Sequence, residues 1–368
     1  MRALLCGGGT AGHVIPAIAI GEIIERNFPN SEIAYAGRRG GDENKAYRKT
    51  GRKLYEVDVR GLQRSLSINN IKTVFKMIKS SRNAREIIKE FKPDVIIGTG
   101  GYVCYPFLRQ GQRLGVKTLL HESNVSPGLV TRMLCRKCDK VMLNLEGTKA
   151  YLKSTKNSVA VGNPTLTDFG VMSKTEARAR IGVKENEILI VSFGGSLGAD
   201  ILNKTVGEMI NKYTSKNKRI RHIHSTGRSN FEKMKKEFPE LFRSSYNVKI
   251  LPYIDNMPTL LTACDLAITR SGAMTVSELC RSGAASILIP SPNVTANHQY
   301  VNAAYMRDTG AALLIEESEL TAKKLYEETA SLIGSQKRMK EMSENALSAA
   351  KRDTEELIVK TLRDVLTP

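Results

Sequence analysis

The sequence predicts an α/β protein made of two doubly wound, Rossmann-like domains. Three observations lead to this prediction. The 368 residues are enough for two domains. The chain opens with an apolar strand, a glycine-rich loop and a helical pattern, and the same succession returns at residues 187–213. In folds of this class the ligand binds at the carboxyl ends of the parallel strands.

The first half of the chain alternates between strands and helical stretches. Arg2–Cys6 is a short apolar strand, and the loop GGGTAGH follows it. Pro16–Phe28 has helical apolar spacing, and Pro16 suits a first helical turn. Ile71–Phe91 is expected to be a long basic helix. The other strands expected here are Ser31–Ala36, Asp94–Ile97, Thr118–His121, Lys140–Leu143 and Ser158–Val161.

The second half repeats this pattern after a break at Gly162-Asn163-Pro164. A linker is expected near Asn163–Ser173, and a charged helix at Ser173–Ile181. The strand Glu187–Phe193 then leads into the loop GGSLG and the helix Ala199–Tyr213. The later strands expected are Arg221–His224, Val248–Leu251, Leu266–Thr269 and Ser286–Ile289, and a helical run is expected over Thr321–Leu366. This arrangement favours two α/β domains in tandem.

Composition restricts the function classes. The net charge of +19 favours an anionic partner, such as nucleic acid, anionic lipid or a phosphate-bearing substrate, although a solvated lysine-rich surface would give the same value. No signal-peptide pattern and no run of about 18 apolar residues occurs, so we expect a cytosolic protein without a membrane span. Cys135 and Cys138 form a lone C-x-x-C pair, and we expect reduced thiols because a zinc site needs four ligands.

The first glycine loop has the spacing of a dinucleotide fingerprint, Gly7-x-Gly9-x-x-Gly12. The acidic residue that should end the next strand is missing, which argues against NAD, and the Lys-Ser/Thr of a Walker A motif is also missing. Backbone N–H groups of such a loop can still approach an anion. His13 directly follows the loop. It is either a residue of the helix start without a chemical role, or a general base or acceptor-orienting group.

Two further motifs in the first half place polar groups after strands. GTGGY at residues 98–102 is either a tight turn or a second loop that grips a diphosphate. HESN at residues 121–124 has the character of a binding edge. The five histidines do not cluster and no D-x-D pair occurs, so we expect no metal site. Helix dipoles and basic side chains would then stabilise a leaving diphosphate.

The second half offers groups suited to a nucleotide sugar. The backbone amides of Gly194–Gly198 and the Ser196 hydroxyl can cradle a diphosphate, and Arg270 offers a cation. The Glu278 carboxylate can accept both ribose hydroxyls, unless it forms a capping box with Thr275. The amide and imidazole groups of Asn297-His298-Gln299 suit sugar hydroxyls.

Taken together, these motifs resemble the MurG family, the UDP-N-acetylglucosamine:lipid I N-acetylglucosaminyltransferases of peptidoglycan synthesis. The matching stretches occur in the family's order over nearly the whole chain, and they are jointly specific although no single one is. They are GGGTAGHVIPA, GTGGYV, HESN, GNP, FGGSLGA, YIDNM, RSGAMTVSE and PSPNVTANHQYVNA.

The resemblance implies a GT-B fold, in which two Rossmann-like domains face each other across a cleft. It implies an acceptor and membrane-binding domain at 1–163, a UDP-sugar domain at 164–345, and a final segment at 346–368 that crosses back to the first domain. The implied reaction is an inverting transfer of N-acetylglucosamine (GlcNAc) to the C4 hydroxyl of the N-acetylmuramyl (MurNAc) unit of lipid I, which gives lipid II for cell-wall biogenesis, cell shape and cell division. No tightly bound cofactor is implied.

The resemblance also assigns site residues. It implies His13 as the base, with Glu122 as the rival. Acceptor contacts are implied for His13, Gly100, Gly101, Tyr102 and Asn124. Ile254 should contact the uracil through its backbone, and Glu278 should bind the ribose. The implied donor contacts are Thr10, Gly12, Asn124, Ser196, Ile254, Arg270, Glu278, His298 and Gln299.

The sequence departs from the family pattern at several of these motifs. Ala11 stands where the family usually has glycine, Ser123 replaces a glutamine, and Cys104-Tyr105 replaces small residues. Leu166 stands where an arginine usually follows GNP, which removes one expected donor contact.

The partners follow from charge and resemblance. Nine basic and two acidic residues lie between Arg60 and Lys92. Within this stretch Lys72, Lys76 and Lys79 surround an apolar helical face formed by Ile71, Val74, Phe75 and Ile78. This face either packs on the core or lies on an anionic inner-leaflet surface. The implied location is therefore the cytoplasmic face of the cell membrane, with UDP-GlcNAc, lipid I and the cell-wall and division machinery as partners.

Two other functions compete with this interpretation. A nucleic-acid-binding protein would explain the charge, but no helix-turn-helix, RNP-type motif or aromatic platform is visible and Trp is absent. Another GT-B transferase could glycosylate diacylglycerol or a small aglycone. GTGGYV and HESN favour lipid I over these acceptors.

Overall fold

The computed structural model describes residues 1–41, 43–59, 69–166, 169, 172–243 and 246–367, with only the backbone described for residue 11 and residues 69–78. The chain divides into two compact units. The N-terminal unit comprises Met1–Leu166 and Lys351–Pro368, and the C-terminal unit comprises Thr167–Ala350. The domain boundaries expected from the sequence, after residues 163 and 345, lie a few residues earlier than these.

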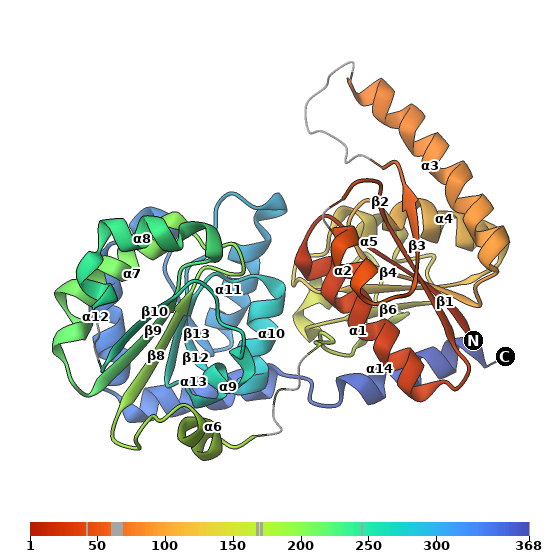
Figure 1. Cartoon of the computed structure of the whole chain (residues 1–368). Helices are drawn as coiled ribbons and strands as arrows, with labels where there is room; N and C mark the ends of the chain where they lie inside the picture. Colours follow the sequence, from red (N-terminus) through yellow and green to blue (C-terminus); the bar gives the residue numbers. More distant parts are fainter. Residues whose placement is uncertain (42, 60–68, 167–168, 170–171, 244–245, 368) are drawn as a thin grey trace. The chain divides into compact units, whose positions relative to one another are not determined.

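A parallel sheet of seven strands forms the centre of the N-terminal unit, in the order β3-β2-β1-β4-β5-β6-β7 (Figure 1). The order reverses between β1 and β4, so the carboxyl ends of these two strands form the switch point at which ligands bind in such sheets. The strands are β1 (Arg2–Gly7), β2 (Glu32–Arg38), β3 (Lys53–Val57), β4 (Val95–Gly100), β5 (Lys117–Glu122), β6 (Lys140–Leu143) and β7 (Ser158–Ala160).

Helices cover both faces of this sheet. On one face α1 and the final helix α14 bury a cluster with strand residues such as Leu5 and Ile97, and on the other α3, α4 and α5 pack on residues such as Leu4 and Ile96. Glu355 of α14 accepts hydrogen bonds from Arg26 and Asn27 at the end of α1, both at 2.7 Å. The helices of this unit are α1 (Ala11–Asn27), α2 (Glu43–Lys49), α3 (Asn69–Phe91), α4 (Cys104–Leu114), α5 (Leu129–Leu134) and α14 (Thr354–Leu366).

The C-terminal unit has a parallel sheet of six strands in the order β10-β9-β8-β11-β12-β13, which is the strand order of the Rossmann fold. Its strands are β8 (Ile188–Phe193), β9 (Ile220–Ser225), β10 (Val248–Leu251), β11 (Leu266–Thr269), β12 (Ala285–Leu288) and β13 (Ala312–Leu314). Its helices are α6 (Lys174–Arg180), α7 (Asp200–Lys212), α8 (Phe231–Glu237), α9 (Met257–Ala263), α10 (Ala273–Ser282), α11 (His298–Asp308), α12 (Ala322–Ile333) and α13 (Gln336–Ala349). The prediction of two doubly wound α/β domains is therefore confirmed.

Every strand expected from an apolar run is present. Two strands were not predicted, and three helices were predicted as one continuous run. β3 was missed because Lys53 and Glu56 interrupt its apolar residues, and β13 because it has only three residues. The expected run Thr321–Leu366 is divided into α12, α13 and α14. Ser335 separates the first two because its hydroxyl caps α13, accepting a bond from the Arg338 N–H.

The start of the first helix was also predicted wrongly. α1 begins at Ala11, so Pro16 lies inside the helix and not in its first turn. Proline has no N–H, so the Gly12 carbonyl loses its usual partner four residues on. The Ser123 hydroxyl donates to this carbonyl at 3.3 Å. The proline is thus tolerated because a side chain from the HESN motif satisfies the freed oxygen.

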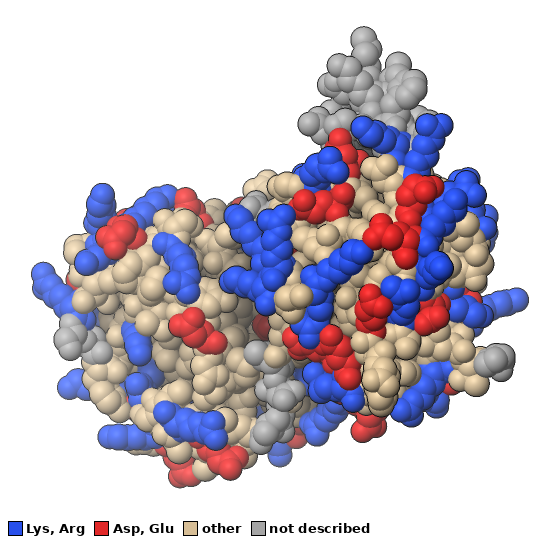
Figure 2. Space-filling model, turned by 45° about the vertical axis from the view of Figure 1, so that its right-hand side comes forward, with Lys and Arg blue, Asp and Glu red and all other residues tan. Residues whose placement is uncertain are grey.

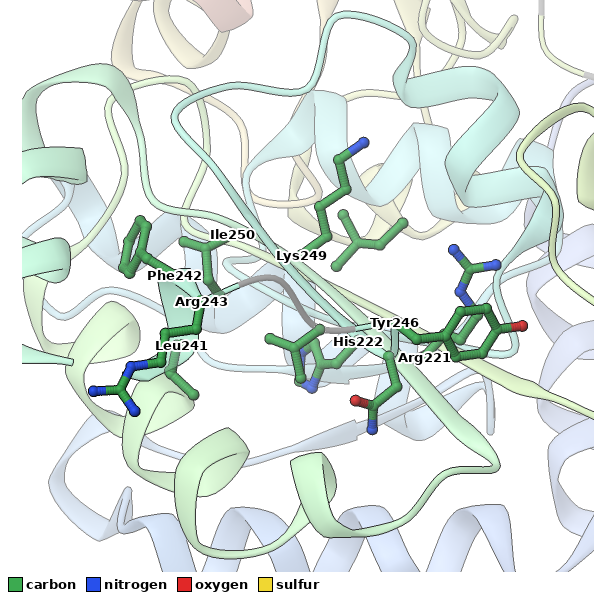
Figure 3. Close-up of a pocket in the computed structure, with 11 residues that line it drawn as sticks. Arg221, His222, Leu241, Phe242, Arg243, Tyr246, Lys249 and Ile250 are labelled. Atoms are coloured by element: carbon green, nitrogen blue, oxygen red, sulfur yellow. The ribbon is translucent and has the colours of Figure 1, made fainter. Parts of the chain in front are cut away.

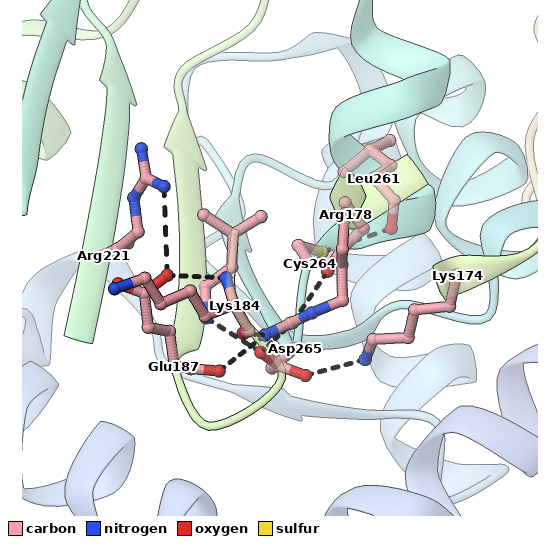
Figure 4. Close-up of polar contacts among 10 residues, drawn as sticks. Lys174, Arg178, Lys184, Glu187, Arg221, Leu261, Cys264 and Asp265 are labelled. Carbon is pink, nitrogen blue, oxygen red and sulfur yellow. Dashed lines mark hydrogen bonds and ion pairs between the residues drawn. The ribbon is translucent and has the colours of Figure 1, made fainter. Parts of the chain in front are cut away.

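A buried ion pair holds α6 against the sheet of the C-terminal unit (Figure 4). The Arg178 guanidinium, which is 8% exposed, donates to Asp265 Oδ2 at 2.9 Å and to the carbonyls of Lys184 and Glu187 at 2.6 and 2.7 Å. Asp265 also accepts from Lys174 Nζ at 2.7 Å and from an N–H of β8. This carboxylate therefore joins α6 to the amino ends of β8 and β11.

We expect Asp265→Ala to lower the free energy of unfolding by about 3–5 kcal/mol, because it leaves the buried Arg178 charge without its carboxylate. Lys174→Ala is the matched control. It removes the exposed partner of the same carboxylate, and should cost no more than about 1 kcal/mol. Urea titration of both variants measures the difference. Equal losses would contradict the account.

Candidate functional site

Two glycine loops pack against each other at the carboxyl ends of β1 and β4. The Gly8 N–H donates to the Gly100 carbonyl at 3.2 Å. Gly100 and Gly101 have φ angles of 122° and 82°, which favour glycine. A Cβ atom on Gly101 would lie 2.3 Å from the Gly8 carbonyl oxygen, so a side chain there would push the loops apart. The motifs GGGTAGH and GTGGY thus form one surface.

His13 is fixed on this surface in a defined tautomer. Its Nδ1 lies 2.9 Å from the Gly8 carbonyl oxygen, which can only accept, so Nδ1 carries the proton and Nε2 is the basic nitrogen. The Thr10 hydroxyl lies 3.3 Å from the same Nδ1. The ring packs on Gly100, where an added Cβ would lie 2.7 Å from Nε2. The imidazole is therefore oriented to take a proton through Nε2.

A residue that the sequence did not single out holds the His13 backbone. Thr99 is buried between the two loops, and its hydroxyl donates to the His13 carbonyl at 2.6 Å. The contact joins residues 86 positions apart, so spacing along the chain gave no signal for it.

The Glu122 carboxylate is fully engaged in positioning its neighbours. Its Oε1 accepts from the Asn124 backbone and side chain at 3.1 and 3.3 Å, and its Oε2 accepts from the Gly128 N–H and the Thr131 hydroxyl at 2.9 and 2.7 Å. Four donors of the chain itself occupy the carboxylate. We therefore expect Glu122 to orient Asn124 and the start of α5 and not to act as the base.

The HESN motif is tied to the GNP motif through a buried histidine. His121 Nε2 lies 3.0 Å from the Gly162 carbonyl oxygen, and burial lowers the pKa of His121. A neutral ring suits this contact because Nε2 can donate its proton to the carbonyl. Tyr102, on the second glycine loop, is 38% exposed and so is accessible to an acceptor.

In the C-terminal unit the loop Gly194–Gly198 connects β8 to α7. The Gly198 N–H closes this turn on the Gly195 carbonyl at 3.1 Å. The N–H groups of Gly195, Ser196 and Leu197 have no partner among the described residues, and the Ser196 side chain is exposed. These groups are available to an anion at the start of α7. Hereafter we call Gly194–Gly198 the phosphate loop.

Arg270 is a buried cation that forms an ion pair within the C-terminal unit. Its guanidinium, 7% exposed, pairs with the Glu317 carboxylate and donates to the Ile289 carbonyl at 3.1 Å. These three residues follow β11, β13 and β12, so the pair ties together three strand ends. The sequence indicated Arg270 but not Glu317, which lies 47 residues away.

Glu278 lies on α10, and no residue in the described part of the chain forms an ion pair with it. Burial raises the pKa of its carboxyl to about 7. The capping-box alternative is wrong, because α10 begins at Ala273 after the N-cap Gly272, and Thr275 is therefore not the N-cap residue. The carboxyl group remains available to a ligand's hydroxyl groups.

Three other predicted donor residues, Gln299, His298 and Ile254, also lie in the C-terminal unit. Gln299 Oε1 accepts from the Ser291 N–H at 2.9 Å, and the Gln299 carbonyl accepts from the Ser271 hydroxyl at 2.7 Å, so the start of α11 is held against the turn after β11. His298 is the first residue of α11, after two left-handed residues. The Ile254 side chain is buried, which suits a contact through its backbone.

A pocket of about 350 Å³ lies elsewhere in this unit, beside strands β9 and β10 (Figure 3). It is lined by residues such as Arg221, Phe242 and Tyr246. None of the predicted site residues lines it, so it does not correspond to the donor site.

Two of the five histidines do lie together, contrary to the expectation from the sequence. Ser192 Oγ lies 2.8 Å from both His222 Nε2 and His224 Nδ1 in the core of the C-terminal unit. Burial lowers the pKa of these histidines to about 3 and about 4, so both are neutral. Over the part of the chain described, no three His, Cys, Asp or Glu side chains form a group that could hold a metal ion.

Lys and Arg side chains lie over much of the face shown in Figure 2, with acidic side chains among them on both units. The described part of α3 exposes Lys79, Arg82 and Arg85 and buries Ala84 and Ile88. The predicted apolar face at residues 71–78 lies outside the described side chains. None of the helices in the described ranges is long and apolar enough to cross a membrane.

Two Rossmann-like units, each with a glycine loop at the end of its first strand, are the components of the GT-B fold, and the family match identifies the class as a glycosyltransferase. The comparisons agree. The model of the glycosyltransferase family 28 N-terminal domain matches residues 3–143, and that of the C-terminal domain matches residues 189–358. The chain belongs to glycosyltransferase family 28 and, within it, to the MurG family.

The relatives that define this membership match over their full length. The "UDP-N-acetylglucosamine--N-acetylmuramyl-(pentapeptide) pyrophosphoryl-undecaprenol N-acetylglucosamine transferase" of Acetivibrio thermocellus is 37% identical over 100% of this chain and 98% of its own. The protein of the same name from Thermoanaerobacter sp. is 38% identical over 99% and 100%. Among solved structures, Acinetobacter baumannii MurG has a TM-score of 0.79 at 24% identity over 99% of each chain, which supports the fold.

Proposed function

We propose that this enzyme transfers GlcNAc from UDP-GlcNAc to the C4 hydroxyl of MurNAc in lipid I, with inversion at the anomeric carbon, to give lipid II. The observation that carries the proposal is the full-length similarity, at 37–38% identity, to curated relatives named for this transfer. The oriented His13 and the phosphate loop supply the groups that the reaction needs. Such a transferase serves peptidoglycan synthesis.

In the proposed reaction His13 is the general base. The C4 hydroxyl gives its proton to Nε2 as its oxygen attacks the anomeric carbon. The bond from that carbon to the UDP oxygen breaks in the same displacement, which inverts the configuration. Thr10 and the Gly8 carbonyl keep the other nitrogen protonated. We place the acceptor against Gly100, Gly101, Tyr102 and Asn124.

The donor is held by the C-terminal unit in this proposal. The N–H groups of the phosphate loop and the positive end of the α7 dipole stabilise the charge that develops on the leaving UDP. The ionised Glu278 carboxylate accepts both ribose hydroxyls, and the Ile254 backbone contacts the uracil. We propose further donor contacts at Thr10, Gly12, Asn124, Ser196, Arg270, His298 and Gln299. The proposal includes no tightly bound cofactor and no protein metal site.

The product tests this proposal directly. The enzyme is incubated with UDP-GlcNAc and a lipid I analogue, and the anomeric configuration of the new linkage is read by NMR. We expect a β-1,4-linked GlcNAc–MurNAc disaccharide. A diacylglycerol acceptor in a parallel reaction tests the rival glycolipid function. Transfer to diacylglycerol but not to the lipid I analogue would refute the proposal.

We also propose that the enzyme works at the cytoplasmic face of the cell membrane, where a lipid-linked acceptor would be found. The excess of basic residues between Arg60 and Lys92 supports attraction to anionic lipid. The proposal also includes proteins of the cell-wall and division machinery as binding partners of the enzyme.

Reversal of charge on α3 tests the membrane proposal. We expect the triple variant Lys72→Glu, Lys76→Glu and Lys79→Glu to lose most of its binding to phosphatidylglycerol vesicles, and the binding of the unmodified enzyme to weaken with salt. The matched control reverses three exposed lysines of the C-terminal unit, Lys323, Lys337 and Lys340. Vesicle sedimentation measures binding. Equal binding by both triple variants would refute the role of α3.

A further inference from the structure

The phosphate loop packs against a second loop, Thr226–Asn230, which follows β9. We call it the β9 loop. Gly198 and Gly227 meet at this contact with φ angles of 79° and 80°. A Cβ on Gly198 would lie 1.9 Å from the Thr226 carbonyl oxygen, and one on Gly227 would lie 2.3 Å from the Leu197 carbonyl oxygen. The two backbones therefore touch, and a side chain on either glycine would displace the phosphate loop.

Two asparagine side chains fix this contact. Asn203, on the first turn of α7, donates from Nδ2 to the Thr226 carbonyl at 2.8 Å. Asn230 donates from Nδ2 to the Leu197 carbonyl at 3.2 Å. Each amide therefore holds a carbonyl of one loop, so the orientation of the peptide units on both sides of the contact is determined.

The buried side chain of Asn203 lowers the stability of the C-terminal unit. It is 4% exposed, and its Oδ1 is buried without a partner among the described residues. A buried polar atom without a hydrogen bond lowers stability, so packing alone does not account for an asparagine at this position. The contact with Thr226 provides one, because it sets the position of the loop in front of α7.

We infer that Asn203, Gly227 and Asn230 are positioning residues for the diphosphate of the sugar nucleotide. They act through the phosphate loop, whose free N–H groups at Gly195–Leu197 must converge on the phosphate oxygens. Displacement of the phosphate loop weakens those hydrogen bonds. We expect the nucleobase contact at Ile254 to stay in place, because the Arg228 guanidinium, 4.9 Å from the centre of the Tyr253 ring, still holds that segment to the β9 loop. This inference rests on the proposed function for the identity of the nucleotide.

The distinction between UDP and uridine separates positioning from general stability. Uridine has the base and ribose of UDP but no phosphate. A residue that positions the phosphate loop affects the binding of UDP and not of uridine. A residue that only stabilises the unit affects the melting temperature and leaves both affinities unchanged.

The test uses Asn203→Ala and Asn230→Ala in the full chain, with Ile210→Val as the matched control. Ile210 lies in the core on the same helix α7 and belongs to neither loop, so we expect its loss of a methyl group to lower stability alone. Calorimetry gives the Kd of UDP, NMR titration gives that of uridine, and steady-state kinetics give the KM of UDP-GlcNAc and of the acceptor. Asn230 is only partly buried, so its variant folds even where Asn203→Ala does not.

We expect the Kd of UDP and the KM of UDP-GlcNAc to rise about tenfold in both asparagine variants, as for the loss of one oriented hydrogen bond. The Kd of uridine and the acceptor KM should stay within about twofold, as should all four constants in Ile210→Val. An unchanged Kd of UDP in Asn230→Ala would overturn the inference and leave the proposed function intact. If the asparagine variants bind UDP more weakly but the unmodified enzyme transfers no GlcNAc, the proposed function is refuted and the inference is supported.

Discussion

His13→Gln is expected to lower kcat by a factor of about 10²–10⁴, the usual contribution of a general base. The amide of glutamine can still donate to the Gly8 carbonyl but has no basic nitrogen to take the acceptor's proton. The KM for UDP-GlcNAc should change little, because the proposed donor site lies mainly in the C-terminal unit. Steady-state assays with a lipid I analogue measure both constants.

Two further measurements separate base catalysis from loop disruption. Added imidazole should restore part of the activity of His13→Ala, because a free base can occupy the vacated space. It should restore none in Glu122→Gln, which disturbs the donors around Glu122 without removing a base. If imidazole rescues Glu122→Gln, or if His13→Gln retains kcat within about threefold, the assignment of the base is wrong.

The second large effect concerns Glu278. Replacement by glutamine should raise the KM for UDP-GlcNAc about 100-fold, because the amide has only one accepting oxygen and no charge, so one charge-assisted hydrogen bond is lost and the other is weakened. The unmodified enzyme should also show a pH dependence. With a pKa of about 7 the carboxyl is neutral below that pH, so the donor KM should fall as the pH rises through 7. In Glu278→Gln the KM should be high and independent of pH in this range.

The same pKa predicts an effect on stability. A carboxyl whose pKa is raised on folding stabilises the folded state below the unfolded pKa of about 4.3, and this contribution is lost as the pH rises through 7. Glu278→Gln should therefore be more stable than the unmodified enzyme at pH 8, by about 1–2 kcal/mol, and not at pH 5. Thermal unfolding at both pH values measures this. Lower stability of the variant than of the unmodified enzyme at pH 8 would contradict the raised pKa of the Glu278 carboxyl.

The sequence predicted the fold well because the decisive signals are local. A buried parallel strand is a continuous apolar run, and a glycine loop follows where the chain turns into a helix. This holds for Arg2–Gly7 and for Ile188–Phe193. The misplaced start of α1 has a different origin. Pro16 normally marks a first turn, and the hydrogen bond that satisfies the freed Gly12 carbonyl comes from Ser123, 111 residues away.

The sequence was less informative about how the site is held together. His13 and Arg270 stand in recognisable motifs, but Thr99 and Glu317, which hold them, were not identified. Asn203, Gly227 and Asn230 were likewise missed. Such residues act through contacts between loops that fold together only in three dimensions, and a polar residue after a strand has no distinguishing pattern. The roles of the site residues stay predictions until they are measured.

The most direct test of the central claim is the release of UDP from UDP-GlcNAc with and without a soluble lipid I analogue, beside Glu278→Ala. We predict release that depends on the acceptor and collapses in the variant at donor concentrations that saturate the unmodified enzyme. UDP release with another lipid or a small acceptor, but none with the lipid I analogue, would agree with a glycosyltransferase and contradict the cell-wall function.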